Sequence, residues 1–259
     1  MTYPSNESST VNGKSVSAML WLGGWSMPDQ VFEPLRSLLP EFRHYSVEYG
    51  SADSQAIMLD MIQAAALAAR SEPLIVAGWS LGGLAALRLA AEGLADGLVL
   101  LASTAKFVRS KAERNLGWPD AFLRHMIHAL ARDREAVEAD FRTKLFTEEE
   151  RERGLESLIP NTGQWTREAL LAGLGLLRDA NLLSDLPDIA CPALVVHGTD
   201  DSVCPYEAAL ELSDALPQAE LLTLHGCGHA PFLGRESVVA EEIRRWRLAS
   251  FERVDSPKV

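Results

Sequence analysis

The chain has 259 residues, of which 47% are hydrophobic and 23% are charged, so it can bury a core without disulfides or structural metal. Its net charge of -12 argues against a nucleic-acid-binding protein, because phosphate contacts need clustered Lys and Arg. The three cysteines, Cys191, Cys204 and Cys227, form no CxxC pair, which argues against a disulfide framework or zinc knuckle and favours a reducing compartment.

The N-terminal segment 1–14 is rich in Ser, Thr and Asn, and it lacks the basic start and apolar run of a signal peptide. No apolar run approaches the roughly 20 residues that a transmembrane helix requires. We therefore expect a flexible tail at 1–14, a cytoplasmic location and no contact with a membrane.

Short apolar runs then alternate with helical stretches. Strands are predicted at 18–22, 45–48, 74–77 and 98–102, and helices at 54–70 and 81–92. The run at 74–77 is fully apolar, as is typical of a parallel strand that is buried on both faces.

From about residue 105 to residue 185 the pattern is helical, with no convincing strand. Residues 124–145 form one amphipathic stretch, and 166–180 predicts another helix. Thr147 followed by Glu150 predicts a helix start, because a Thr cap with Glu three residues later forms a capping box. Segment 105–155 also carries 11 of the 24 basic residues but only 10 of the 36 acidic ones.

Alternation resumes with strands at 193–196 and 220–224 and helices at 206–216 and 236–251. Strands that alternate with helices predict an α/β fold with a mostly parallel central sheet and helices on both faces. We expect a core made of 15–104 and 186–259, with 105–185 inserted as a helical lid. Active sites in such sheets lie at the carboxyl ends of the strands.

The segment Gly78-Trp79-Ser80-Leu81-Gly82 follows a predicted buried strand and precedes a predicted helix. A sharp strand-to-helix turn exposes a serine hydroxyl, and glycines on either side let the neighbouring backbone approach closely. The G-x-S-x-G pattern alone could be an ordinary glycine-rich turn. Its position between strand and helix favours Ser80 as the nucleophile of an α/β-hydrolase.

A serine hydroxyl needs a base, and in this fold class the order along the chain is Ser, then an acid, then His. His229 follows the last predicted strand in a glycine-flanked loop and is the predicted base. His225 and His197 are expected to be structural or packing residues. Asp200 and Asp201 are the two candidates for the acidic residue. We favour Asp201 because it stands shortly before Pro205, the proline that is expected to open the next helix.

The first strand runs into Gly23-Gly24-Trp25. Ester cleavage builds negative charge on the carbonyl oxygen, and two backbone N–H groups usually stabilise it. We expect these from Trp25 and from Leu81, the residue after the nucleophile. An ordinary glycine-rich turn at Gly23 remains the alternative.

These motifs, with Asp201-Ser-Val-Cys-Pro and Gly228-His-Ala-Pro-Phe, resemble the pimeloyl-[acyl-carrier protein] methyl ester esterase family. The resemblance covers roughly 18–104 and 190–250. It implies hydrolysis of a carrier-bound methyl ester, with substrate contacts from Trp25, Ser80, Leu81 and His229 and, in the lid, from Phe141, Arg142 and Leu145. The chain departs from the pattern in having Gly23-Gly24 in place of His-Gly, and Glu48-Tyr-Gly-Ser-Ala after the second strand.

The resemblance also implies an acyl carrier protein as partner. Such carriers are acidic, so a basic docking surface is needed on an acidic enzyme. The candidate side chains in the lid are Arg109, Lys111, Arg114, Arg124, Arg142, Lys144, Arg151 and Arg153; solvated helix faces are the alternative. Five apolar lid side chains could form a channel for the acyl chain: Phe107, Phe122, Phe141, Leu145 and Phe146.

We expect a monomer that needs neither metal nor cofactor. Three other functions stay open on the residues alone. They are a broad esterase for small free esters, a synthase or lyase on the same fold, and a non-enzymatic binding protein. An intact triad argues against the last, because a binding protein has no need of all three groups.

Overall fold

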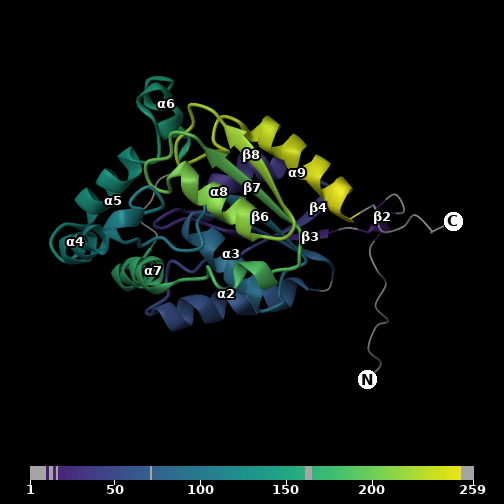
Figure 1. The fold of residues 1–259 in the computed structure, drawn as a ribbon, viewed down its shortest axis with the longest axis horizontal. Helices are drawn as coiled ribbons and strands as arrows, with labels where there is room; N and C mark the ends of the chain where they lie inside the picture. The colour runs from purple at the N-terminus through teal and green to yellow at the C-terminus, as the bar shows by residue number, and fades with distance from the viewer. Residues whose placement is uncertain (1–9, 12–13, 16, 71, 161–164, 252–259) are drawn as a thin grey trace.

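A computed structural model of the chain describes residues 10–11, 14–15, 17–70, 72–160 and 165–251 (Figure 1). Its centre is a six-stranded, fully parallel sheet in the order β4-β3-β5-β6-β7-β8. The strands are β3 (Ser17–Leu22), β4 (Phe42–Ser46), β5 (Leu74–Trp79), β6 (Gly97–Leu101), β7 (Ala193–Gly198) and β8 (Ala219–Leu224). The predicted α/β fold with a mostly parallel sheet is therefore confirmed.

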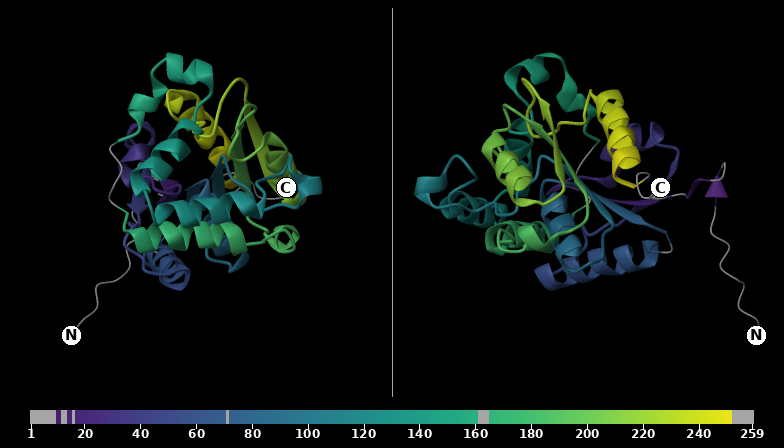
Figure 2. Two further views of the ribbon diagram at one scale, coloured as in Figure 1. Left: turned by 90° about the vertical axis from the view of Figure 1, so that its left-hand side faces the viewer. Right: turned by 45° about the vertical axis from the view of Figure 1, so that its right-hand side comes forward.

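Helices cover both faces of this sheet. They are α1 (Glu33–Ser37), α2 (Gln55–Ala69), α3 (Leu81–Ala91), α8 (Tyr206–Ala215) and α9 (Glu236–Phe251), with short 3-10 turns η1 (Asp29–Phe32) and η4 (Leu186–Asp188). Helices α1 and α9 contact each other on one face, and α2 packs beside α3 on the other. In the right-hand view of Figure 2, α9 and α2 lie on opposite sides of the strands.

The burial of the strands explains their composition. Every residue of β3, β5, β6 and β7 is buried, whereas all residues of the edge strand β8 are only half-buried. Central parallel strands are covered on both faces and are therefore apolar throughout. The second strand begins at Phe42 and not at Tyr45, where it was predicted. Polar residues alternate with apolar ones along this outer strand, so no apolar run marks its first residues.

Most of the predicted tail, 1–14, lies outside the described residues. Near its end, β1 (Thr10–Val11) pairs with β2 (Lys14–Ser15) in an antiparallel ribbon. Among the residues that the structure describes, no helix is long and apolar enough to cross a membrane.

Between β6 and β7 the chain forms a group of helices that lie together on the left in Figure 1. They are α4 (Asp120–Leu130), α5 (Arg134–Thr143), α6 (Glu148–Glu152) and α7 (Arg167–Asp179), with 3-10 turns η2 (Lys111–Glu113) and η3 (Leu155–Leu158). The predicted capping box of Thr147 and Glu150 is present at the start of α6. The prediction of one continuous stretch at 124–145 was wrong, because α4 and α5 are separate helices. Asp133 accepts a hydrogen bond from the N–H of Ala136 and starts the second of them.

The turn from β5 into α3 depends on three glycines. A Cβ at Gly78 would overlap the backbone of Gly82, and a Cβ at Gly82 would overlap the carbonyl of Leu22 in β3. A Cβ at Gly83 would overlap the Ser103 hydroxyl. Two of these neighbours are backbone, which cannot rotate away, so the start of α3 lies directly against the end of β3.

We expect Gly82→Ala to lower the free energy of unfolding by about 3 kcal/mol or more, because the new methyl group must displace the β3 backbone. Gly154→Ala is the matched control. Gly154 has a φ of 77° and open space around its Cα, so only the left-handed conformation is penalised, by about 1 kcal/mol. Urea denaturation of both variants measures the difference, and equal losses would contradict the close-contact explanation.

Candidate active site

Ser80 lies at the turn between β5 and α3. Its φ of 56° and ψ of -115° are unusual for a residue with a side chain, and such strain is found at functional sites. Its N–H donates to the carbonyl of Leu101 in β6 (3.0 Å), and its carbonyl accepts from Gly83 and Leu84 at the start of α3. The serine is thereby held at the carboxyl edge of the sheet, as the motif predicted.

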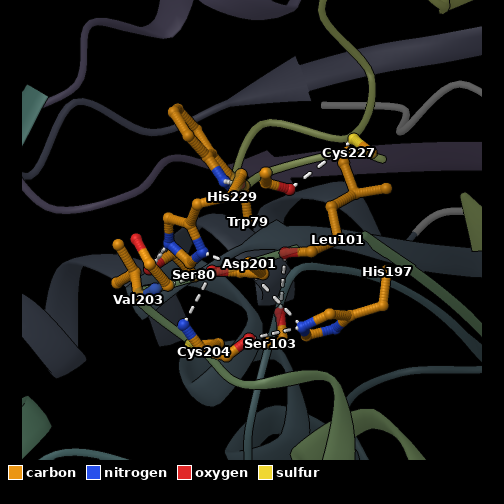
Figure 3. Close-up of polar contacts among 12 residues, drawn as sticks. Trp79, Ser80, Leu101, Ser103, His197, Asp201, Val203, Cys204, Cys227 and His229 are labelled. Atoms are coloured by element: carbon orange, nitrogen blue, oxygen red, sulfur yellow. Dashed lines mark hydrogen bonds and ion pairs between the residues drawn. The ribbon is translucent and has the colours of Figure 1, made fainter. Parts of the chain in front are cut away.

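The imidazole of His229 lies between Ser80 and Asp201 (Figure 3). Its Nε2 is 2.8 Å from the Ser80 Oγ, and its Nδ1 is 2.8 Å from the Asp201 Oδ2. The three residues follow β5, β7 and β8, which are not all neighbours in the sheet, yet their side chains meet at one edge. His229 is fully buried, and Ser80 and Asp201 are each only 6% exposed, so water is largely kept from the hydrogen bonds between them.

The carboxylate of Asp201 is fixed at both oxygens. Oδ1 accepts from the backbone N–H groups of Val203 and Cys204, each at 2.8 Å, and Oδ2 faces His229. Burial alone would raise the pKa of Asp201, but the imidazoles of His229 and His197 outweigh it and hold the pKa below its ordinary value. The competing Asp200 instead accepts a hydrogen bond from the Thr199 hydroxyl and does not touch His229.

His197 makes a contact that sequence reasoning missed. We interpreted it as a packing residue at the end of β7, and it is fully buried. Its Nε2 also lies 2.8 Å from the carbonyl of Cys204 and 3.3 Å from the Asp201 Oδ2. Since both neighbours accept hydrogen bonds, Nε2 carries a proton, and the Asp201 Oδ2 therefore faces a second imidazole besides that of His229. Its spacing of four residues before Asp201 was the only available signal.

The loop after β3 is held by three side-chain hydrogen bonds to other parts of the chain. The Tyr49 hydroxyl donates to the carbonyl of Gly23, the Trp25 indole donates to the carbonyl of Leu170 (2.9 Å), and the Trp165 indole donates to the carbonyl of Met27 (3.3 Å). Two of these partners come from α7 or the segment that precedes it.

The backbone N–H groups of Trp25 and Leu81 donate to no acceptor within the described ranges. The expectation that these two groups stabilise an oxyanion stays a prediction.

Ser26, next to Trp25, is a second strained position, with a φ of 60°. Its hydroxyl donates to the carboxylate of Glu138 in α5, which also pairs with Arg134 (2.6 Å). Glu138 is buried, and no local sequence signal distinguished it from the other acidic residues of its helix.

The three predicted lid residues lie at different depths. The Phe141 ring packs edge-on against Trp25 at a centroid distance of 5.1 Å. Leu145 is fully buried, and its backbone carbonyl accepts from the N–H of His229 (2.8 Å). Arg142 is half-buried and donates to the carbonyl of Pro160 (3.3 Å), and burial lowers its pKa.

Of the five apolar side chains suggested as a channel, Phe107, Leu145 and Phe146 are buried in the core. Phe122, which is exposed, and Phe141, which is also buried, line a groove together with Trp118 and Met126. The groove also includes Ser202, the neighbour of Asp201, so one end of it lies close to the hydrogen-bonded residues Ser80, His229 and Asp201.

Comparison with known families gives a match to the alpha/beta hydrolase family over residues 17–242. A pimeloyl-[acyl-carrier protein] methyl ester esterase from Xanthomonas oryzae pv. oryzae is 34% identical over 251 residues, which cover 88% of this chain and 94% of that protein. An enzyme of the same name from Nitrosomonas europaea is 35% identical over 226 residues and covers 83% and 89%, respectively.

Solved structures agree in fold. An esterase from Exiguobacterium antarcticum superposes with a TM-score of 0.74 at 19% identity, covering 89% of this chain and 91% of that one. A bromoperoxidase from Bacillus anthracis superposes with a TM-score of 0.76 at 14% identity, covering 90% and 92%. With its parallel sheet, its serine turn and a match over most of its length, this chain belongs to the alpha/beta hydrolase family.

Proposed function

We propose that this chain is a serine carboxylesterase that hydrolyses the methyl ester of a pimeloyl chain carried on acyl carrier protein. The observation that carries the proposal is the hydrogen-bonded series from Ser80 through His229 to Asp201, with 2.8 Å at each step. The name shared by the relatives that are 34% and 35% identical supports the choice of ester.

In the first half of the reaction, His229 removes the Ser80 proton and the hydroxyl oxygen attacks the ester carbonyl. Asp201 is ionised, so it orients Nδ1–H toward itself, leaves Nε2 free to accept, and stabilises the imidazolium that forms. The N–H groups of Trp25 and Leu81 receive the negative charge on the carbonyl oxygen. The tetrahedral intermediate collapses, and methanol leaves with the proton from His229.

In the second half, His229 deprotonates a water molecule that attacks the acyl-enzyme. Collapse of the second intermediate releases the carboxylic acid and restores the Ser80 hydroxyl. Neither step needs a metal or a cofactor, and the donors, the base and the nucleophile all come from one chain, which suits a monomer. The three free cysteines suit a reducing compartment, and we place the enzyme in the cytoplasm.

The acyl chain has a candidate path along the groove that is lined by Trp118, Phe122 and Met126. Phe141 connects this groove to the reacting centre, because its ring lines the groove and also packs against Trp25. Phe122 is 60% exposed, which is unusual for a large apolar side chain and suits a surface that receives an apolar ligand. In this proposal the segment 105–185 acts as the lid over the site.

The carrier would bind basic side chains that are not already neutralised. Arg109 is buried against Glu211, while Arg124 and Lys144 pair with Asp120 and Asp140 on their own helices. Two more candidates donate to backbone carbonyls, Arg142 to Pro160 and Arg151 to Thr143 and Phe146. Across the segments that the structure describes, Lys111, Arg114 and Arg153 form no ion pair and are exposed, so we propose these three for docking.

The function is tested directly by incubating the purified chain with pimeloyl-carrier methyl ester and following release of methanol and free acid. Growth of a biotin-requiring strain that lacks its own methyl ester esterase is the matching test in cells. Turnover of short p-nitrophenyl esters with none of the carrier-bound ester would favour the broad esterase. Failure of a fluorophosphonate to phosphonylate Ser80, with loss of fluoride, would favour the synthase or lyase.

We expect Asp201→Asn to lower kcat by about 10⁴-fold, because the amide favours the wrong tautomer of His229. Asp200→Asn should leave turnover close to that of the wild type, since Asp200 does not touch the imidazole. Steady-state hydrolysis of p-nitrophenyl acetate checks both variants, with circular dichroism to establish that they are folded. A larger loss in Asp200→Asn would reverse the assignment of the acid.

Charge reversal at Lys111 and Arg114 together should raise KM for the carrier-bound ester several-fold and leave KM for a free methyl ester unchanged. The matched control is Arg70→Glu, an exposed arginine at the C-terminal end of α2; the hydrogen bond of this helix to the inserted helix α7 is made at its other end, by Gln55. Equal effects on the two substrates, or an equal effect of the control, would refute docking at these positions.

A further inference from the structure

The loop that carries His229 has little structure of its own. It follows β8, contains Gly226 with a φ of 65°, and passes through Gly228 before reaching the histidine. A catalytic imidazole must keep its orientation to within a fraction of an ångström, because a misplacement of about 1 Å can cost 10²-fold in rate. The loop therefore depends on contacts from elsewhere in the chain.

Five hydrogen bonds supply these contacts. Two come from the segment after β7, where the Thr199 hydroxyl accepts from the N–H of Gly226 and the N–H of Asp200 donates to the carbonyl of Cys227. The other three reach Gly228 and His229, and two of these three come from the inserted helices. The N–H of Gly228 donates to the Glu150 Oε2 (3.0 Å), and the N–H of His229 donates to the carbonyl of Leu145 (2.8 Å). Only the third, from the Trp79 indole to the carbonyl of His229 (2.7 Å), comes from the sheet. The turn from α5 to α6 thus contacts the histidine loop at consecutive peptide groups.

Glu150 is suited to this contact because its carboxylate is buried and fully partnered. The residue is 2% exposed, and Oε2 accepts from the N–H of Thr147 in the capping box (3.0 Å) as well as from Gly228. Oε1 pairs with Arg235 at 2.7 Å. Since Arg235 directly precedes α9, the carboxylate joins the insertion to the core, and its charge is neutralised there.

The same turn also contacts the loop of the catalytic acid. The Ser202 hydroxyl, next to Asp201, donates to the carbonyl of Lys144 (3.1 Å). Arg151 donates to the carbonyls of Thr143 and Phe146, which fixes the backbone on either side of this contact. The turn is therefore a rigid surface against which the loops of both the acid and the base pack.

A glycine is required at position 228 because the inserted segment lies too close for a side chain. A Cβ there would lie 2.7 Å from the carbonyl oxygen of Leu145 and 2.9 Å from the Glu150 Oε2. The atoms that exclude a side chain at this position belong to the α5–α6 turn and to α6, and not to the sheet. The glycine beside the histidine thus permits the close contact.

We propose that Glu150 is a positioning residue for His229, acting through the peptide N–H of Gly228, so that part of the lid belongs to the catalytic machinery. This inference rests on the proposed function, because it concerns the base of the same reaction. Glu150 touches neither substrate nor reacting atoms; it sets the orientation of the group that does. Its removal should therefore lower kcat and leave KM for a small ester nearly unchanged.

The decisive comparison uses Glu150→Ala, Glu150→Gln and Glu113→Ala. Glu113 is the matched control, because it closes an equivalent capping box with Ser110 in the same insertion and lies near Arg109, but does not touch the histidine loop. The readouts are kcat and KM for p-nitrophenyl acetate and the rate at which a fluorophosphonate labels Ser80. Circular dichroism and thermal melting identify variants that do not fold.

We expect Glu150→Ala to lower kcat and the labelling rate by about 10- to 100-fold. Glu150→Gln should recover most of this loss, since an amide oxygen can still accept from Gly228, and Glu113→Ala should match the wild type. Gly228→Ala gives an independent check, because it displaces the same contacts while leaving the carboxylate in place. It should lower kcat by a similar factor, and it decides the question should Glu150→Ala fail to fold.

A folded Glu150→Ala or Gly228→Ala variant with the kcat and labelling rate of the wild type would overturn the inference. So would a change confined to KM, because that would assign Glu150 to the substrate site. Absence of labelling in the wild-type chain is a different result: it would overturn the proposed function, and this inference with it.

Discussion

The close approach of α3 to the sheet is the constraint on which the rest of the site depends. Ser80 has a backbone conformation that costs on the order of 1–3 kcal/mol, and it persists because the surrounding chain leaves no alternative. Its N–H is bonded to β6, its carbonyl begins α3, and three glycines let that helix lie against the end of β3. This geometry is built on β5, a central strand that is buried along its whole length.

The other residues of the site are held around this serine by hydrogen bonds, several of which join segments far apart in the sequence. Asp201 is bound by two backbone N–H groups and two imidazoles, so its carboxylate has a single orientation. The loop with Trp25 is held by Glu138 through Ser26, and the loop with His229 by Glu150 through Gly228. Two buried carboxylates of the inserted helices thus support opposite sides of the reacting centre. The inserted helices therefore support the loops that carry Trp25 and His229.

Much of this could be predicted from local patterns. The sheet, the helices that flank it and the order of Ser80, Asp201 and His229 follow from apolar runs, glycine positions and the sequence of strands. The division of 124–145 into two helices was missed although Asp133 is a good cap, because the apolar period continues across the break. Glu150 was recognised as a capping residue, but its bonds to Gly228 and Arg235 span about eighty residues, and no local pattern encodes such contacts.

The hydrogen bond from the Trp79 indole to the carbonyl of His229 has a consequence for how the enzyme responds to heat. Trp79 is the last residue of β5 and is covalently joined to Ser80, so nucleophile and base are anchored to the same buried strand. Regions with such anchors open only with the core and show slow amide exchange, unlike frayed loops. Loss of activity on warming should therefore coincide with cooperative melting of the sheet instead of preceding it.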